Sequence, residues 1–372
     1  MKRNQILGIV FSVLAIFLFS KSGFAQVENA YVTNFGGDSV SVINTATNSL
    51  VEKIPVGEEP VGIAINSSCT TAYVVNFLSN SISAINLGRN NVFDTLTSPD
   101  IQSPNDVIIS PDDSTLYVDG PSNNVLVIDT STLSISTTIP VGDTVQTMAI
   151  TPDGTKLFAA TNNDYSVIDT ATNTVLDTIA IPPPFIDVQR FTVSPDGQRI
   201  YLPDRLAFVS GIAGIIISTA TNQVIGNMAP IPDPVAATFL GFVPNSSKAY
   251  LSGGNSTGND LMQIYDPDNN LFTGSFFVGS RATDMAFTQD GTRAYVVRGN
   301  FFDDASAVAV VNTASDQLID TINFPPIDDP ARIAICVPQP SVVPTISEWG
   351  MIVMVGVFAI AAVVFLRRRA VA

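Results

Sequence analysis

The chain has 372 residues, with 17 Lys and Arg, 33 Asp and Glu and no histidine, for a formal net charge of −16. The lack of histidine excludes zinc sites built on histidine and nucleophiles of the Ser-His-Asp or Cys-His type. The negative charge disfavours nucleic acid and anionic lipid headgroups as partners. Because 46% of the residues are hydrophobic and 13% are charged, the composition predicts a folded chain.

The first 25 residues are predicted to be a secretory signal peptide. Lys2 and Arg3 precede an apolar run over residues 6–19, and small residues precede a cleavage point near Ala25. The alternative is an uncleaved anchor helix, although the apolar run is short for a bilayer span. Both interpretations predict an exported chain.

An internal repeat dominates residues 26–338. An aromatic anchor recurs about every 41 to 49 residues, at Tyr31, Tyr73, Tyr117, Phe158, Tyr201, Tyr250 and Tyr295. The sequence of each copy predicts four short strands, because residues 39–43 alternate as a half-buried strand does, and residues 138–142 end in Pro and Gly as an outer strand does. Turns such as residues 151–154 connect them, with Pro presetting φ and Gly taking positive φ. Seven copies predict an all-β, seven-bladed β-propeller.

Three motifs resemble those of a known repeat family. They are the Tyr31-Val32-Thr33-Asn34 strand, the IDTATN turn at residues 168–173 and the SPDG turn at residues 194–197. They resemble the YVTN β-propeller repeats of surface-layer-like and other exported bacterial proteins. The resemblance spans nearly the whole repeat region. Because its motifs are structural, it implies a fold and no particular activity.

The two ends of the repeat region predict how the ring closes. The first copy lacks an inner strand, and the last copy ends on one. We therefore expect one closing blade, with residues 330–336 as its innermost strand and residues 27–57 as the other three.

Both cysteines fall near this closure. Cys336 ends the predicted inner strand, and Cys69 lies in the inner turn of the next blade, where other copies have Gly154 or Gly197. A disulfide would join the two blades if the Cα atoms lie within about 7 Å of each other. The alternative is two separate thiols.

The first residues of the seven inner strands form a candidate site at the mouth of the central channel. These residues are Arg332, Gly62, Asp106, Thr147, Arg190, Phe239 and Asp284. Charged side chains at a crowded axis cost desolvation energy unless they are paired. The two arginines, the two aspartates and Thr147 are therefore candidates for binding a small polar ligand, although the cost of unpaired charge favours the other interpretation. The alternative is an Arg–Asp network that plugs the channel.

Three connections are longer than their counterparts in the other copies, at residues 204–214, 252–260 and 299–307. The last carries four residues predicted to form a contact loop, Phe301, Phe302, Asp303 and Asp304. Exposed aromatics beside acids often mark a contact surface. The alternative is ordinary variation in loop length.

The sequence predicts no metal site, no cofactor and no catalytic residue. Residues 266–270 begin as a calcium loop does, but the Gly at position six and the Glu at position twelve are missing. No glycine-rich phosphate loop is present. Most acids lie in repeated turns, as Asp153, Asp196 and Asp290 do, so no catalytic carboxylate pair stands out.

The C-terminal segment predicts a membrane tether. Residues 349–366 are apolar and three arginines follow, which predicts a transmembrane helix and basic tail over residues 351–369 with the arginines in the cytoplasm. The linker and motif before it, residues 339–350, resemble IPTL-CTERM sorting domains, although Val343 and Ile346 depart from the family pattern. The motif residues are Val343, Pro344, Thr345, Ile346, Ser347, Glu348, Trp349 and Gly350. The resemblance implies recognition by a membrane sorting enzyme, and the alternative is a plain anchor.

Taken together, these features predict an exported, membrane-tethered or surface-sorted propeller. Its expected function is non-enzymatic, as a binding or scaffold protein with a protein or glycan partner. One alternative is a hydrolase, lactonase or lyase with its site at the channel mouth. Another is a structural component of a cell-surface layer.

Overall fold

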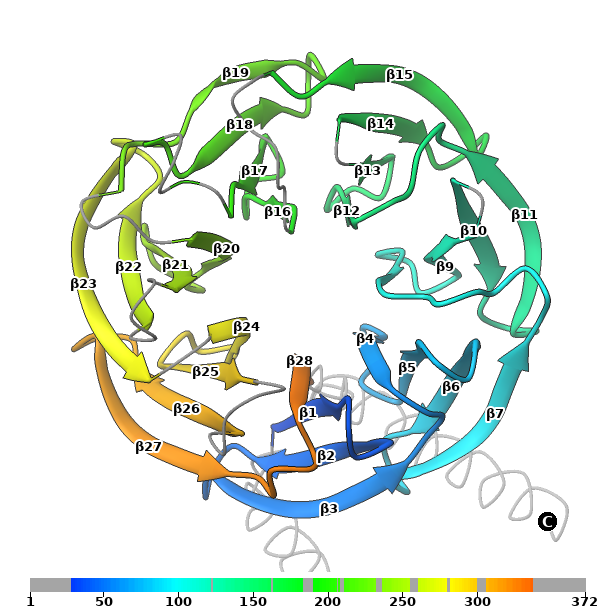
Figure 1. The fold of residues 1–372 in the computed structure, drawn as a ribbon, viewed down its shortest axis with the longest axis horizontal. Coiled ribbons are helices and arrows are strands. Elements are labelled where there is room, and N and C mark those ends of the chain that lie inside the picture. The colour runs from blue at the N-terminus through cyan, green and yellow to red at the C-terminus, as the bar shows by residue number, and fades with distance from the viewer. Residues whose placement is uncertain are drawn as a thin grey trace, which may run out of the picture. The chain divides into compact units, whose positions relative to one another are not determined.

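Seven four-stranded antiparallel sheets stand around a central axis (Figure 1), which confirms the predicted all-β, seven-bladed propeller. The computed structural model describes residues 28–121, 123–161, 163–182, 190–205, 207, 211–231, 236–254, 260–279, 282–299 and 306–336. Within these ranges no helix is both long enough and apolar enough to span a bilayer. The predicted signal peptide, sorting motif and C-terminal helix lie outside them.

Each blade runs from an inner strand at the axis to an outer strand at the rim. The inner strands are β28 (Pro330–Cys336), β4 (Pro60–Ile65), β8 (Val107–Ile109), β12 (Thr147–Ile150), β16 (Thr192–Val193), β20 (Ala236–Phe242) and β24 (Ala282–Phe287). The second strands are β1 (Asn29–Asn34), β5 (Thr71–Asn76), β9 (Thr115–Gly120), β13 (Lys156–Ala160), β17 (Arg199–Pro203), β21 (Ala249–Gly254) and β25 (Arg293–Arg298).

The outer half of each blade is a hairpin. The third strands are β2 (Ser39–Asn44), β6 (Ser81–Asn86), β10 (Asn124–Asp129), β14 (Asp164–Asp169), β18 (Gly214–Ser218), β22 (Asp260–Asp266) and β26 (Ala307–Asn312). The outer strands are β3 (Ser49–Pro55), β7 (Asn91–Thr97), β11 (Ser134–Pro140), β15 (Thr174–Ala180), β19 (Val224–Asn227), β23 (Leu271–Gly279) and β27 (Gln317–Asn323). Every outer strand contains a bulge against its neighbour, which twists this exposed edge and disfavours edge-to-edge pairing.

The strand β28 closes the ring by pairing with β1, so the two ends of the propeller share one sheet (Figure 1). Tyr31 pairs with Ala334, and Ala30 pairs with Ile335. Because this pairing is antiparallel and runs the length of β1, backbone hydrogen bonds seal the junction between the first and last repeats. The pairing also brings Arg332, on β28, to the axis. There β28 contacts the inner strands of the two flanking blades, β24 and β4.

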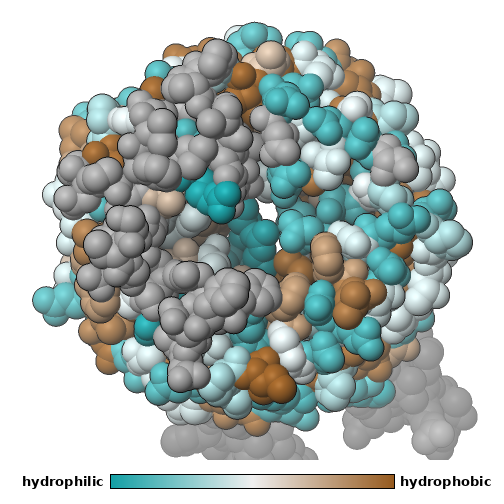
Figure 2. Space-filling view, in the orientation of Figure 1, coloured by the Kyte–Doolittle hydropathy of each residue, from teal (hydrophilic) through white to brown (hydrophobic). Residues whose placement is uncertain are grey.

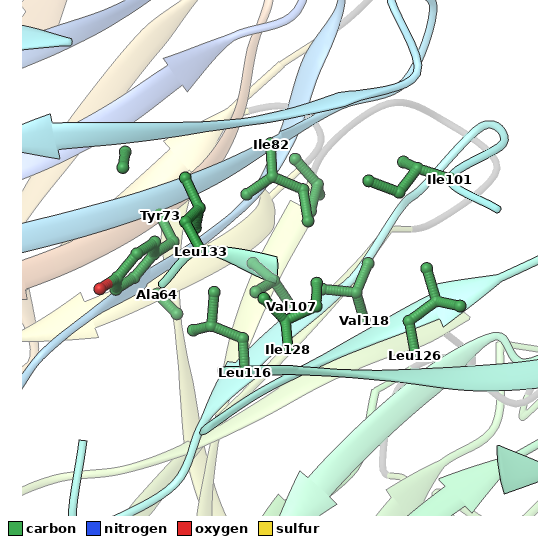
Figure 3. Close-up of a cluster of buried hydrophobic side chains, with 12 residues drawn as sticks. Ala64, Tyr73, Ile82, Ile101, Val107, Leu116, Val118, Leu126, Ile128 and Leu133 are labelled. Atoms are coloured by element: carbon green, nitrogen blue, oxygen red, sulfur yellow. The ribbon is translucent and has the colours of Figure 1, made fainter. Parts of the chain in front are cut away.

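Apolar clusters between neighbouring blades form the core. Figure 3 shows one of them, in which Tyr73 and Ile82 of one blade pack against Leu116, Val118 and Ile128 of the next. The anchor tyrosines also carry a polar contact, since the hydroxyl of Tyr295 donates a 2.7 Å hydrogen bond to Oδ1 of Asn48 in the next blade. Tyr295 therefore joins adjacent sheets by packing and by hydrogen bonding, as does Tyr250, whose hydroxyl donates to Asp316 of the next blade.

The inner turns are held by side-chain hydrogen bonds. The hydroxyl of Thr151 donates to Oδ1 of Asp153 at 2.5 Å, and that oxygen also accepts the N–H of Thr155 at 3.1 Å. Gly154 adopts φ +71°, which favours glycine. These bonds hold the pKa of Asp153 below its ordinary value, chiefly through the Thr151 hydroxyl and the Thr155 N–H.

Candidate functional site

The seven residues predicted at the channel mouth occupy equivalent positions. In every sheet the residue two positions further on pairs with the aromatic anchor, as Ala149 pairs with Phe158 and Thr192 with Tyr201. Figure 2 shows an opening at the centre of the molecule bordered by hydrophilic residues. The seven residues therefore share one register position, although only Thr147 among them is the first residue of its inner strand, as the sequence predicted for all seven. Their role in binding stays a prediction.

Arg190 and Asp284 form an ion pair that bridges non-adjacent blades. Nη1 of Arg190 donates to Oδ1 of Asp284 at 2.5 Å. The guanidinium carbon lies 4.7 Å from the ring centre of Phe239, the equivalent residue of the intervening blade. Phe239 thus supports the arginine by a cation–π contact while the carboxylate fixes its end.

The carboxylate of Asp284 also receives two backbone hydrogen bonds. Its Oδ1 accepts the N–H of Met285 at 2.9 Å, and its Oδ2 accepts the N–H of Ile333, on the closing strand, at 3.0 Å. The side chain is 3% exposed. Because a buried carboxylate needs such partners, Asp284 is a structural tie between β24 and β28 as well as the partner of Arg190.

Asp106 makes a similar connection between two other blades. Its Oδ2 accepts the N–H of Met148 at 2.9 Å and the hydroxyl of Thr147 at 3.4 Å. Both hydrogen bonds use the same carboxylate oxygen. With the described residues, Oδ1 makes no hydrogen bond, so it can accept one from a ligand.

Asp119 is a functional-site candidate that the sequence analysis did not single out. It lies on β9 two residues after the anchor Tyr117, and its Oδ1 accepts the N–H groups of Asn105 and Asp106 at 2.8 and 2.7 Å. The pKa of Asp119 is raised to about 7, chiefly by burial. The hydrogen bond from the Asp106 N–H opposes this shift, and the charge of Asp106 adds to it. The equivalent residues elsewhere, such as Thr33 and Ala160, are uncharged, so alignment of the second strands would have found it.

Arg332 lies near the axis, and its side chain makes no hydrogen bond with a described residue. Its guanidinium interacts electrostatically with Arg190, Asp284, Asp106 and Asp119, which belong to three other blades. Burial lowers the pKa of Arg332 below its ordinary value, Arg190 lowers it further, and the three carboxyls raise it. Among the described residues, no hydrogen bond or ion pair engages the guanidinium. The predicted Arg–Asp network is therefore incomplete at Arg332.

The contact loop, the cysteines and the predicted lack of a metal site are the remaining predictions. Phe301, Phe302, Asp303 and Asp304 lie outside the described residues. Cys69 is disulfide-bonded and takes φ +57° in its turn, where the equivalent Gly154 and Gly197 take +71° and +70°. The chain has one other cysteine, Cys336, at the end of β28. In the described ranges no three Cys, Asp or Glu residues lie close enough to hold a metal ion.

Comparison with known proteins identifies the fold and nothing finer. No protein-family model and no curated protein matches the chain. Hydrazine synthase of Kuenenia stuttgartiensis superposes with a TM-score of 0.65 and 20% identity over 77% of this chain and 92% of its own. A Bacteroides uniformis protein provisionally named a 6-phosphogluconolactonase gives 0.67 and 14% over 84% and 100%. A Desulfotomaculum acetoxidans protein of unknown function gives 0.65 and 16% over 84% and 99%. At these identities the likeness shows a propeller alone.

The channel residues can act chemically in two ways. Arg190 and Arg332 supply positive charge and fixed N–H donors, while Asp106 supplies a free acceptor oxygen. Such a set can hold a ligand that has both an acidic group and hydroxyl groups. Asp119, with a pKa of about 7, can hold or release a proton near neutral pH.

Proposed function

We propose that this chain is an exported, membrane-tethered binding protein whose central channel is its ligand site. One observation carries the proposal, namely that charged side chains from four blades converge at the axis while no described residue forms a hydrogen bond or ion pair with the guanidinium of Arg332. A channel that served stability alone would be filled by apolar side chains or by closed ion pairs, because an unpaired buried charge is destabilising. Charges kept at that cost favour a binding role.

The export and tether rest on the two terminal segments. The signal-peptide pattern of residues 1–25 and the apolar segment followed by three arginines support a chain that crosses the membrane once and keeps its propeller outside. The motif at residues 343–350 supports a sorting enzyme as a processing partner. A protein or glycan that carries the ligand chemistry is the expected partner of the propeller itself.

A ligand screen on the full-length protein tests the binding function. We expect polar acids, sugars or amines to raise the melting temperature of the wild type. The same compounds should have a smaller effect on the Asp106→Asn variant, which removes charge from the channel, than on Asp94→Asn, which removes charge from the outer strand β7. If no compound distinguishes the two variants, the channel is not the ligand site.

One observation favours a second function, a hydrolase with Asp119 as general base. Its pKa of about 7 suits proton transfer at neutral pH. Two solved structures of similar fold come from Bacteroides proteins provisionally named 6-phosphogluconolactonases. A lactone substrate panel assayed with wild type and Asp119→Asn decides between the functions. Turnover that Asp119→Asn abolishes establishes the hydrolase, and binding without turnover supports the binding protein.

A further inference from the structure

We propose that Arg332, with Arg190 beside it, binds the oxyanion group of a polyhydroxylated acid, a carboxylate or a phosphate, in the central channel. This inference rests on the binding function proposed above and adds the chemical class of the ligand.

The guanidinium of Arg332 offers donors that no described residue uses. An arginine side chain has five N–H donors in a planar fork that matches carboxylate and phosphate groups. Here the side chain is only partly exposed, so water cannot surround it as it would on an open surface. A partly buried cation without a partner is an energetic cost that binding of an anion removes.

The backbone holds Arg332 at a fixed place on the axis. Its N–H donates a 3.0 Å hydrogen bond to the hydroxyl of Thr33, and that hydroxyl donates to the carbonyl of Val61 at 2.8 Å in the next blade. The next residue, Ile333, donates its N–H to Asp284. The strand is therefore anchored on both sides of Arg332, and the binding group starts from an ordered position.

Arg190 places a second guanidinium close to the first. Its positive charge lowers the pKa of Arg332, as expected for a cation nearby. Arg190 is itself held between the carboxylate of Asp284 and the ring of Phe239, so it cannot move away easily. Two neighbouring guanidinium groups repel each other, and an oxyanion between them removes this repulsion and accepts hydrogen bonds from both.

The acidic side of the channel explains why the ligand should also carry hydroxyl groups. Oδ1 of Asp106 has no hydrogen bond with a described residue, while its Oδ2 is occupied by Thr147 and Met148. A carboxylate accepts hydrogen bonds and repels a simple anion. A hydroxy acid satisfies both halves of the site, with its acidic group on the arginines and a hydroxyl group on Asp106.

Calorimetric titration of the full-length protein tests the assignment with four probes. Gluconate carries a carboxylate and hydroxyls, sorbitol carries the hydroxyls alone, acetate carries the carboxylate alone, and inorganic phosphate tests the other oxyanion. We expect gluconate to bind more tightly than sorbitol and acetate. Gluconate binding should weaken about 10- to 100-fold in Arg332→Gln, the range for losing a hydrogen bond to a charged group.

Matched variants separate the possible results. Arg332→Lys keeps the charge and should lose less affinity than Arg332→Gln, whereas Arg89→Gln removes an exposed charge from the hairpin between β6 and β7 and should change nothing. Equal gluconate affinity in wild type and Arg332→Gln overturns the assignment, and so does the absence of binding by all three anions. In either case, a probe that binds Asp106→Asn more weakly than the wild type would still support the channel as a ligand site. The proposed ligand class can therefore fail while the proposed binding function stands.

Discussion

Arg190 and Asp284 meet at 2.5 Å across the channel, although the blade of β20 separates their strands. Phe239 of that blade lies beneath the guanidinium and supports it. The pair links blades that share no backbone hydrogen bonds, and it leaves Arg332 as the remaining cation at the axis. Among the described residues, Arg190 is therefore ion-paired and Arg332 is not. Substitution of these two arginines should change the free energy of unfolding in opposite directions.

Removal of Arg190 should destabilise the propeller. Arg190→Gln leaves the buried Asp284 with its two backbone hydrogen bonds and without its cation, so we expect the free energy of unfolding to fall by about 1–3 kcal/mol. Urea denaturation followed by circular dichroism measures the change. Arg89→Gln is the control because it removes the same charge from an exposed turn. Equal curves for the two variants would show that the ion pair adds nothing.

Removal of Arg332 should stabilise the protein when no ligand is present. The side chain has no hydrogen-bond partner among the described residues, and a glutamine there eliminates an unpaired charge. We expect the free energy of unfolding of Arg332→Gln to rise by about 1 kcal/mol, since a partly buried charge without a hydrogen-bonded partner is destabilising. A variant less stable than the wild type in the same urea titration would mean that Arg332 is paired in solution.

Asp119 should make stability fall as the pH rises through neutrality. Its pKa is raised to about 7, above the value near 3.9 in an unfolded chain, so the folded state binds the proton more tightly. The stability that this group contributes is complete at low pH and is lost as the pH rises through 7, by on the order of 2 kcal/mol between pH 5 and 8.

Asp119→Asn tests this pH dependence directly. The amide oxygen can accept both backbone N–H groups that Oδ1 accepts now, and the variant does not titrate. We expect the unfolding free energy of the variant to change little between pH 5 and 8, and to exceed that of the wild type at pH 8. A variant with the same pH slope as the wild type would place the titrating group elsewhere.

The inner turns should give the opposite pH dependence in acid. The pKa values of Asp153, Asp196 and Asp290 are lowered chiefly by the hydroxyl of the residue two positions before each of them. Their contribution is present above the unfolded value near 3.9 and is lost as the pH falls through the lower folded value. The melting temperature of Asp153→Asn should therefore fall less between pH 5 and pH 2 than that of the wild type. Asp94→Asn, on an outer strand, is the control, and an equal effect of both would exclude the turns as the cause.

The effect of Cys69→Gly on stability should change sign between oxidising and reducing buffer. In oxidising buffer Cys69→Gly loses a disulfide and should be less stable by about 2–4 kcal/mol. In reductant it should be more stable than the wild type by about 1 kcal/mol, because glycine adopts φ +57° without the steric cost that cysteine has there. Thermal melts in both buffers measure the two signs. If Cys336→Ser matches Cys69→Gly in oxidising buffer, the two cysteines are partners; if it melts as the wild type does, that pairing is wrong.

The repeat made the fold predictable from the sequence. Seven aromatic anchors at near-constant spacing set the number of blades, and the anchor fixes the strand register because its partner lies two residues after the channel position. Both are properties of local pattern. The same spacing puts Arg190, Asp284 and Arg332 at equivalent register positions in their blades.

The pairing within that ring was not predictable in the same way. Whether Arg190 reaches Asp284 or Asp106 depends on side-chain length and on Phe239 as a support, which no local pattern encodes. Asp119 escaped notice because it lies on a second strand, and only its pairing geometry brings it under Asp106. Charge interactions across an axis combine segments that are far apart in sequence, so spacing alone could not specify them.

A crystal structure of the full-length protein grown with gluconate would show where this ligand binds. We expect density for the ligand in the channel, with its carboxylate within hydrogen-bonding distance of Arg332 and Arg190 and a hydroxyl on Oδ1 of Asp106. Gluconate bound elsewhere, or an empty channel in which Arg332 is paired with one of the carboxylates, would contradict this expectation.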